Sequence, residues 1–210
     1  MLVWINGPFG GGKTQTAYEL NRRLRGSVVC DPEEVGFGLH RMTPRGLRGD
    51  FQDRPAWRQG VYEVLDLVLR KHNGVVIAPM TLVEPAYFRE TIGRLRENGH
   101  DVRHFALLAE RETVLRRLRE RGLGHLLHYV TGKSGSLRRE SFAVSKLDFC
   151  LERLSGPEFA DHIRTDQTPV AEVADHIAAA TGLSLAPNTD GALRGELRRA
   201  WTGVKHIRLR

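Results

Sequence analysis

The sequence predicts an α/β fold in which a doubly wound parallel sheet is covered by helices on both faces. Apolar runs alternate along the chain with segments whose apolar residues recur at helical spacing, as in repeated strand–helix–strand units. The run VVIAPMT at 75–81 is almost wholly apolar, which is typical of a central parallel strand. A chain of 210 residues with an apolar share of 40% is sized for one such domain with a short appendage.

The first half of the chain is predicted to begin with a short apolar strand at 2–5 and a helix at 14–24. A second buried strand at 27–31 is followed by a short helix that begins at Pro32. A long helix begins at Pro55, because proline is tolerated in the first turn, and continues to about residue 71. Its buried face is predicted to contain Trp57, Val61, Val64, Leu65, Val68 and Leu69.

The second half continues the alternation after the strand at 75–81. A helix is predicted at 85–97, where the pair Asn98-Gly99 ends it. An arginine-rich helix at 110–121 is expected to end at Gly122. Strands connected in this way by helices imply crossover connections and therefore a parallel sheet. The remaining elements are strands at 102–108 and 162–165 and helices at 146–154 and 170–180.

Two segments depart from this pattern. Residues 123–145 lose the helical spacing and are rich in glycine, serine and arginine, so we predict a lid at about 122–145. It would belong to a single domain of residues 1–185. After the break Ala186-Pro187-Asn188, residues 186–210 form a basic tail, which we predict to be an amphipathic helix.

The glycine-rich turn after the first strand matches a phosphate-binding motif. Its sequence GPFGGGKT fits the P-loop pattern GxxxxGK[ST], and a strand precedes it and a helix follows it, as the motif requires. Glycines let backbone N–H groups converge on phosphate oxygens at a helix N-terminus. We predict that Lys13 reaches the β- and γ-phosphates and that the Thr14 hydroxyl binds Mg²⁺. The predicted nucleotide-binding residues are Gly7, Pro8, Phe9, Gly10, Gly11, Gly12, Lys13, Thr14 and Gln15.

A carboxylate, Asp31, ends the second predicted strand. Ligands of open α/β sheets lie beyond the carboxyl ends of the strands, so Asp31 is a candidate base for an acceptor hydroxyl or an organiser of Mg²⁺. The alternative is that Asp31 only caps the helix that follows. The strand at 75–81 ends in Thr81 without the carboxylate that many P-loop ATPases have there. This difference favours a small kinase over a motor or switch ATPase.

Further candidates are polar residues at the same edge of the predicted sheet. Thr81 could contact the substrate or merely end its strand, and Asp53, with Asp50, could contact an acceptor or belong to a solvated loop. Phosphoryl transfer needs cations over the phosphates, and we name Arg119 as the candidate catalytic arginine. The other candidates for that role are Arg116, Arg117, Arg121, Arg138 and Arg139.

Composition narrows the class of protein. Cys30 and Cys150 have no metal-ligand spacing, and we predict that the histidines are surface or packing residues. No run is long and apolar enough for a transmembrane helix, and no signal-peptide pattern is seen, so we expect a cytoplasmic protein. The net charge of +7 permits phosphate or anionic surfaces as partners, but no aromatic platform supports nucleic acid as a partner.

The tail at 190–210 has six Lys or Arg against two acidic residues. A basic amphipathic helix of this kind either lies on an anionic membrane surface or packs its apolar face on the domain. The sequence leaves this choice open, and the oligomeric state as well.

Several segments resemble those of the bacterial tunicamycin-resistance ATP-binding proteins. They are WINGPFGGGKTQTAYELNRRL, DPEEVGFGLHRM, DFQDRPAWR, VIAPMTLVEPAYFRETIGRLRENG and DHIRTD. The resemblance implies a P-loop nucleotide-binding fold, resistance to a uridine-containing nucleoside antibiotic, and membrane association. The chain is also similar to antibiotic kinases of the chloramphenicol phosphotransferase type and to shikimate kinase. In those proteins a second-strand carboxylate acts near the acceptor hydroxyl, and here that position is Asp31.

The motif and the resemblance together predict an ATP- and Mg²⁺-dependent phosphotransferase that inactivates a nucleoside antibiotic such as tunicamycin. One alternative is an ATP-binding protein that sequesters the drug unmodified, either at the membrane surface or away from it. Another is a kinase of nucleotides or of nucleic-acid ends.

Overall fold

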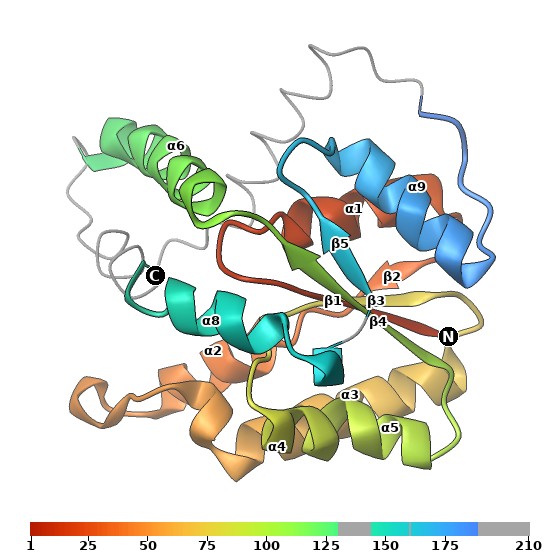
Figure 1. The fold of residues 1–210 in the computed structure, drawn as a ribbon. Helices are drawn as coiled ribbons and strands as arrows, with labels where there is room; N and C mark the ends of the chain where they lie inside the picture. The colour runs from red at the N-terminus through yellow and green to blue at the C-terminus, as the bar shows by residue number, and fades with distance from the viewer. Residues whose placement is uncertain (130–143, 160, 189–210) are drawn as a thin grey trace.

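The computed structural model describes residues 1–129, 144–159 and 161–188 (Figure 1). Its sheet has five strands in the order β2-β3-β1-β4-β5, and every pairing is parallel. The doubly wound parallel sheet predicted from the sequence is therefore confirmed. The strands are β1 (Leu2–Asn6), β2 (Val28–Val29), β3 (Val76–Pro79), β4 (Val102–Leu108) and β5 (His162–Arg164).

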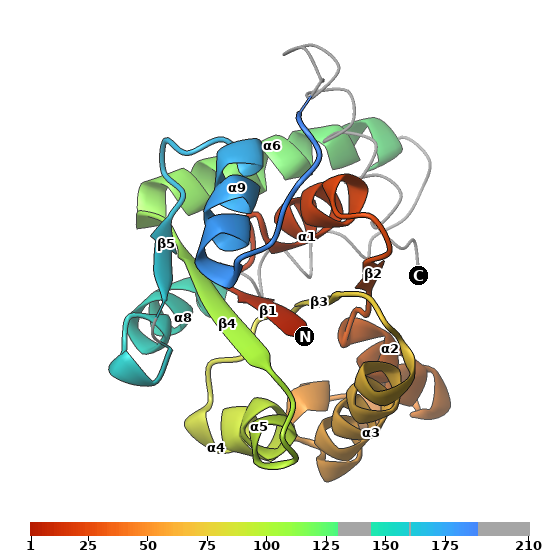
Figure 2. The ribbon, with the colours of Figure 1, turned by 90° about the vertical axis from the view of Figure 1, so that its right-hand side faces the viewer.

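Helices cover both faces of the sheet (Figures 1 and 2). The helices on one face are α1 (Lys13–Arg23) and α9 (Val170–Thr181). Those on the other are α3 (Pro55–Lys71), α4 (Pro85–Phe88), the π-helical turn η3 (Arg89–Gly93) and α5 (Arg94–Glu97). Strand β1 supplies both cores: Leu2 and Trp4 pack with the α3 side, whereas Val3 and Ile5 pack with the α1 side. Such alternation places a strand between two buried layers.

The remaining elements connect these strands and helices. Helix α2 (Glu33–Met42) follows β2, and two 3₁₀ turns, η1 (Arg45–Leu47) and η2 (Phe51–Asp53), lead into α3. Helices α6 (Arg111–Tyr129) and α8 (Leu147–Leu154) pack together through Val114, Leu118 and Leu147. The 3₁₀ turn η4 (Pro157–Phe159) precedes β5.

Four details differ from the sequence predictions. The second strand was predicted to be buried at 27–31, and it is only Val28–Val29 and half-buried. Helix α6 does not end at Gly122 but continues through Gly124 to Tyr129, because an interior glycine costs only about 1 kcal/mol relative to alanine. Val64 was predicted to be buried on α3 and is 48% exposed. The helix at 85–97 contains the π-helical turn η3. Residues 130–143 of the predicted lid and 189–210 of the predicted tail lie outside the described residues.

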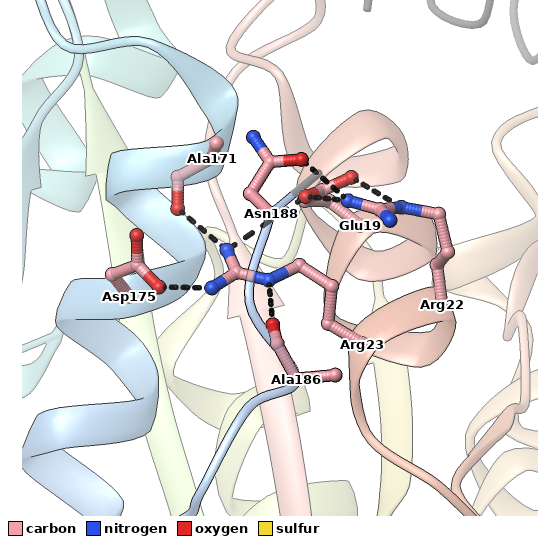
Figure 3. A network of polar contacts seen from close by, with 7 residues as sticks. All are labelled: Glu19, Arg22, Arg23, Ala171, Asp175, Ala186 and Asn188. Atoms are coloured by element: carbon pink, nitrogen blue, oxygen red, sulfur yellow. Dashed lines mark hydrogen bonds and ion pairs between the residues drawn. The ribbon is translucent and has the colours of Figure 1, made fainter. Parts of the chain in front are cut away.

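Buried Arg23, at the end of α1, joins three parts of the chain (Figure 3). Its guanidinium donates to the carbonyl of Ala186 at 2.8 Å, to that of Ala171 at 3.4 Å, and to the Asp175 carboxylate at 2.6 Å. The neighbouring Arg22 donates to Asn188 at 3.0 Å. The P-loop helix α1, helix α9 and the segment after α9 are thereby held together.

Among the described residues, no helix has both the length and the apolar character needed to cross a membrane.

Candidate functional site

The P-loop has a backbone that only glycine adopts readily at two key positions. Gly12 precedes α1 with φ of 91°, and Gly7 leaves β1 with φ of 148°. A Cβ atom on Gly7 would lie 2.7 Å from the carbonyl oxygen of Leu107, so a side chain has no room there. The loop therefore begins against β4 and ends at the N-terminus of a helix, where backbone N–H groups and the helix dipole favour an anion.

Lys13 and Thr14 occupy the first turn of α1, as the motif predicts. Lys13 is 8% exposed, and its ammonium donates to the Pro8 carbonyl at 2.9 Å. It also lies 5.6 Å from the centre of the Phe9 ring. Thr14 and Gln15 are half-buried at the same helix end. The loop thus places one cation and one hydroxyl at the N-terminus of a helix, which is an arrangement that suits the phosphates of a nucleotide.

Asp31 lies just beyond β2, at the carboxyl edge that also carries the P-loop. Its Oδ1 accepts a hydrogen bond from the Glu33 backbone N–H at 3.0 Å. The cap alternative weighed from the sequence is therefore part of the structure. Its role toward an acceptor hydroxyl stays a prediction.

Thr81 is 6% exposed, behind the P-loop. Its hydroxyl donates to the Gly7 carbonyl at 2.7 Å, and its own carbonyl accepts from the Gln52 side chain at 2.9 Å. The hydroxyl proton is therefore directed at the loop, and substrate contact by Thr81 stays a prediction. The sequence suggested no such link, because Gly7 and Thr81 are far apart in the chain.

Asp53, the other predicted substrate contact, accepts a hydrogen bond from the Tyr87 hydroxyl at 2.9 Å. This bond raises the pKa of Tyr87 above its ordinary value. Asp50 accepts from the Gln52 N–H at 3.0 Å and so caps η2. Contact of Asp53 with an acceptor stays a prediction.

The same corner contains a buried cation that the sequence analysis missed. The Arg58 guanidinium lies 4.4 Å from the centre of the Tyr87 ring, donates to the Gln52 carbonyl, and pairs with Glu90 at 2.6 Å. A signal was present in the sequence, because Arg58 falls at helical spacing with Val61 and Leu65 on the buried face of α3.

The arginines of α6 differ in their surroundings. Arg117 turns toward β5 and donates to the hydroxyl of Thr165 at 3.2 Å and to its carbonyl. Burial lowers the pKa of the Arg117 guanidinium, and the Asp166 carboxylate opposes that shift. Arg116 and Arg119 are exposed, and a catalytic role for Arg119 stays a prediction. Nothing is described of the side chain of Arg121, and Arg138 and Arg139 lie outside the described residues.

Across the described part of the chain, no three His, Cys, Asp or Glu side chains form a metal-binding group. Mg²⁺ in phosphoryl-transfer sites is held by few protein ligands together with phosphate oxygens and water, so the Thr14 hydroxyl suits it.

Comparison with known proteins agrees with this geometry. Residues 2–126 match the family described as AAA domain. The solved structure of the tunicamycin resistance protein of Deinococcus radiodurans is 35% identical, with a TM-score of 0.70, over 89% of this chain and 98% of that one. No curated protein matches the chain.

Two kinases share the fold at lower identity. A gluconokinase from Sinorhizobium meliloti is 16% identical with a TM-score of 0.55, covering 94% of this chain and 95% of that one. A shikimate kinase from Bacteroides thetaiotaomicron is 15% identical with a TM-score of 0.55, covering 87% and 99%. The P-loop kinase-like fold implies nucleotide binding. By its matched domain and its 35% identity over nearly the whole chain, this protein belongs to the AAA-domain family and to the family of the tunicamycin resistance protein.

Proposed function

We propose that the protein is an ATP- and Mg²⁺-dependent phosphotransferase that modifies a hydroxyl group of a nucleoside antibiotic such as tunicamycin. The observation that carries the proposal is the pairing of two features at one sheet edge. A P-loop follows β1, and a carboxylate, Asp31, follows β2, while β3 is followed by Met80, Thr81 and Leu82 rather than by a carboxylate. This arrangement suits transfer to a hydroxyl. The choice of an antibiotic as the acceptor is inferred from the relationship to the Deinococcus protein.

Each proposed residue has a separate task. The N–H groups of the P-loop and the Lys13 ammonium hold the phosphates, and the Thr14 hydroxyl holds Mg²⁺, which neutralises phosphate charge when bound. The acceptor O–H bond breaks as its proton passes to Asp31. A bond forms between that oxygen and the γ-phosphorus, and the bond from the γ-phosphorus to the bridging oxygen breaks, which releases ADP.

A second candidate, sequestration of the drug without modification, is supported by the cap at Asp31. A carboxylate that serves as a helix cap need not act as a base. The two candidates differ in stoichiometry, because an enzyme protects against excess drug and a sink saturates at its own concentration.

Mass spectrometry of tunicamycin incubated with the protein, ATP and Mg²⁺ decides between them, with Lys13→Ala as the control. A gain of one phosphoryl group that the control lacks is the expected result. Unmodified drug that stays bound to the protein supports sequestration. If the drug is neither modified nor bound, the acceptor is a different molecule.

A further inference from the structure

Two buried polar side chains behind the P-loop have no part in the proposed chemistry. Asn6, the last residue of β1, is 0% exposed, and Thr81, beyond β3, is 6% exposed. A buried polar side chain is costly unless it is hydrogen-bonded, so the partners of these two residues indicate why the fold keeps them.

The Asn6 amide uses its full hydrogen-bonding capacity. Its Oδ1 accepts from the N–H of Gly7 at 2.8 Å and from that of Leu82 at 2.9 Å. Its Nδ2 donates to the Leu82 carbonyl at 2.7 Å and contacts Nε2 of buried His104 at 3.2 Å. An amide nitrogen carries two protons and the oxygen two lone pairs, so all four positions are filled when Nε2 of His104 is the unprotonated ring nitrogen and accepts from Nδ2. The side chain therefore has one orientation.

Thr81 binds the carbonyl group of Gly7, whose N–H group is bonded to Asn6. Its hydroxyl donates to the Gly7 carbonyl at 2.7 Å, while Asn6 accepts from the Gly7 N–H. Both backbone polar groups of the first P-loop residue are thus bonded to buried side chains. We call Asn6 and Thr81 the Gly7 clamp. Because a Cβ on Gly7 would meet Leu107, the residue is confined from the β4 side as well.

The clamp also reaches the predicted acceptor side. The Thr81 carbonyl accepts from the Gln52 side chain at 2.9 Å, and the Gln52 carbonyl accepts from Arg58 at 2.6 Å. Gln52 lies in η2 next to Asp53. One residue, Thr81, is therefore bonded to the P-loop through its hydroxyl and to the η2 segment through its carbonyl.

We propose that Asn6 and Thr81 are positioning residues that orient the P-loop at Gly7 for nucleotide binding, and that Gln52 links this clamp to η2. Binding groups that are held in place before the ligand arrives lose less entropy on binding. The inference rests on the nucleotide-binding part of the proposed function and does not depend on the identity of the acceptor.

Threonine substitutions test the clamp. Thr81→Val keeps the side-chain shape and removes the donor to Gly7, whereas Thr81→Ser keeps the hydroxyl. Thr91→Val is the matched control, because Thr91 is also fully buried and donates to backbone carbonyls, but within α4 and η3. The measurements are the affinity for the Mg²⁺ complex of a non-hydrolysable ATP analogue, by calorimetry, and the thermal midpoint.

We expect Thr81→Val to weaken analogue binding about tenfold, as the loss of a buried hydrogen bond allows, and Thr81→Ser to restore most of it. Thr91→Val should lower the thermal midpoint with unchanged affinity. Unchanged affinity in Thr81→Val, or an equal loss in Thr91→Val, overturns the positioning role. An unmutated protein that binds no analogue overturns the nucleotide-binding function itself, and the clamp with it.

Gln52→Leu tests the link to η2 by hydrogen exchange of residues 50–54. In the unmutated protein the analogue should slow exchange in this segment. In Gln52→Leu the analogue should still bind but protect the segment less. Equal protection in both proteins would remove Gln52 from the proposal.

Discussion

Asp31 has two candidate roles, cap and base, which one substitution separates. Asparagine caps helices about as well as aspartate, so Asp31→Asn keeps an acceptor for the Glu33 N–H. It cannot take up the acceptor proton. We expect undetectable phosphoryl transfer, ATP-analogue affinity within a few-fold and an unchanged thermal midpoint.

Asp31→Ala is the companion variant, because it removes the cap as well. It should also lose about 1 kcal/mol of unfolding free energy, measured by urea titration. Phosphoryl transfer that persists in Asp31→Asn would leave Asp31 as a cap only.

Residues differ in how far the sequence alone could assign them. Lys13 and Thr14 lie in a local motif whose spacing, strand and helix all agree, so their places could be predicted. Thr81 could not be assigned, because the partner of its hydroxyl comes from a distant part of the chain. Asn6 was overlooked for the same reason.

At the scale of elements, we predict that the contact between η2 and α4 depends on pH. The hydrogen bond to Asp53 raises the pKa of Tyr87, so the bond stabilises the fold fully below the ordinary tyrosine pKa of about 10. That stability is lost as the pH rises through the higher pKa of the folded state. Between pH 8 and pH 11, the thermal midpoint of Tyr87→Phe should therefore fall by less than that of the unmutated protein. Parallel losses would show that the bond is too weak to matter.

The junction of α1, α9 and residue 186 depends on the planar guanidinium of Arg23. Arg23→Lys keeps the charge but cannot donate to Ala186, Ala171 and Asp175 together. We expect a loss of about 1–3 kcal/mol in unfolding free energy by urea titration, since a lysine at this buried position cannot replace all three hydrogen bonds. Arg22→Lys, at a more exposed position, should change it by less than about 1 kcal/mol. Equal losses of unfolding free energy in the two variants would contradict the special role of the Arg23 guanidinium.

Element positions were predictable where the apolar pattern was strong. Strand β4 has the bounds that the sequence predicted, because Val102 and residues 105–108 are apolar. The predicted end of α6 at Gly122 was wrong. Glycine ends a helix through a left-handed backbone and capping bonds, which the sequence alone does not show. The guanidinium fork of Arg23 depends on three partners from distant segments, so no local pattern could predict it.

For the whole molecule, the predicted tail at 190–210 has two alternative positions, on a membrane or on the domain. We predict that the full chain sediments with vesicles of anionic lipid and that the chain ending at residue 189 does not. Neutral vesicles are the control, because attraction of the six basic residues requires anionic lipid. A truncated chain with a lower thermal midpoint and unchanged sedimentation would instead indicate packing on the domain.

The order of the strands in the sheet has a consequence for synthesis on the ribosome. Strand β1 is made first, yet its only neighbours in the sheet are β3 and β4. Val76, the partner of Leu2, leaves the ribosome about 70 residues after Asn6, which is roughly 4–14 seconds at usual rates of translation. During that time the uncharged run Leu2–Ile5 has no strand to pair with. The nascent chain therefore carries an exposed apolar segment that ribosome-bound chaperones would bind, and the P-loop takes its final form only after β4 is complete.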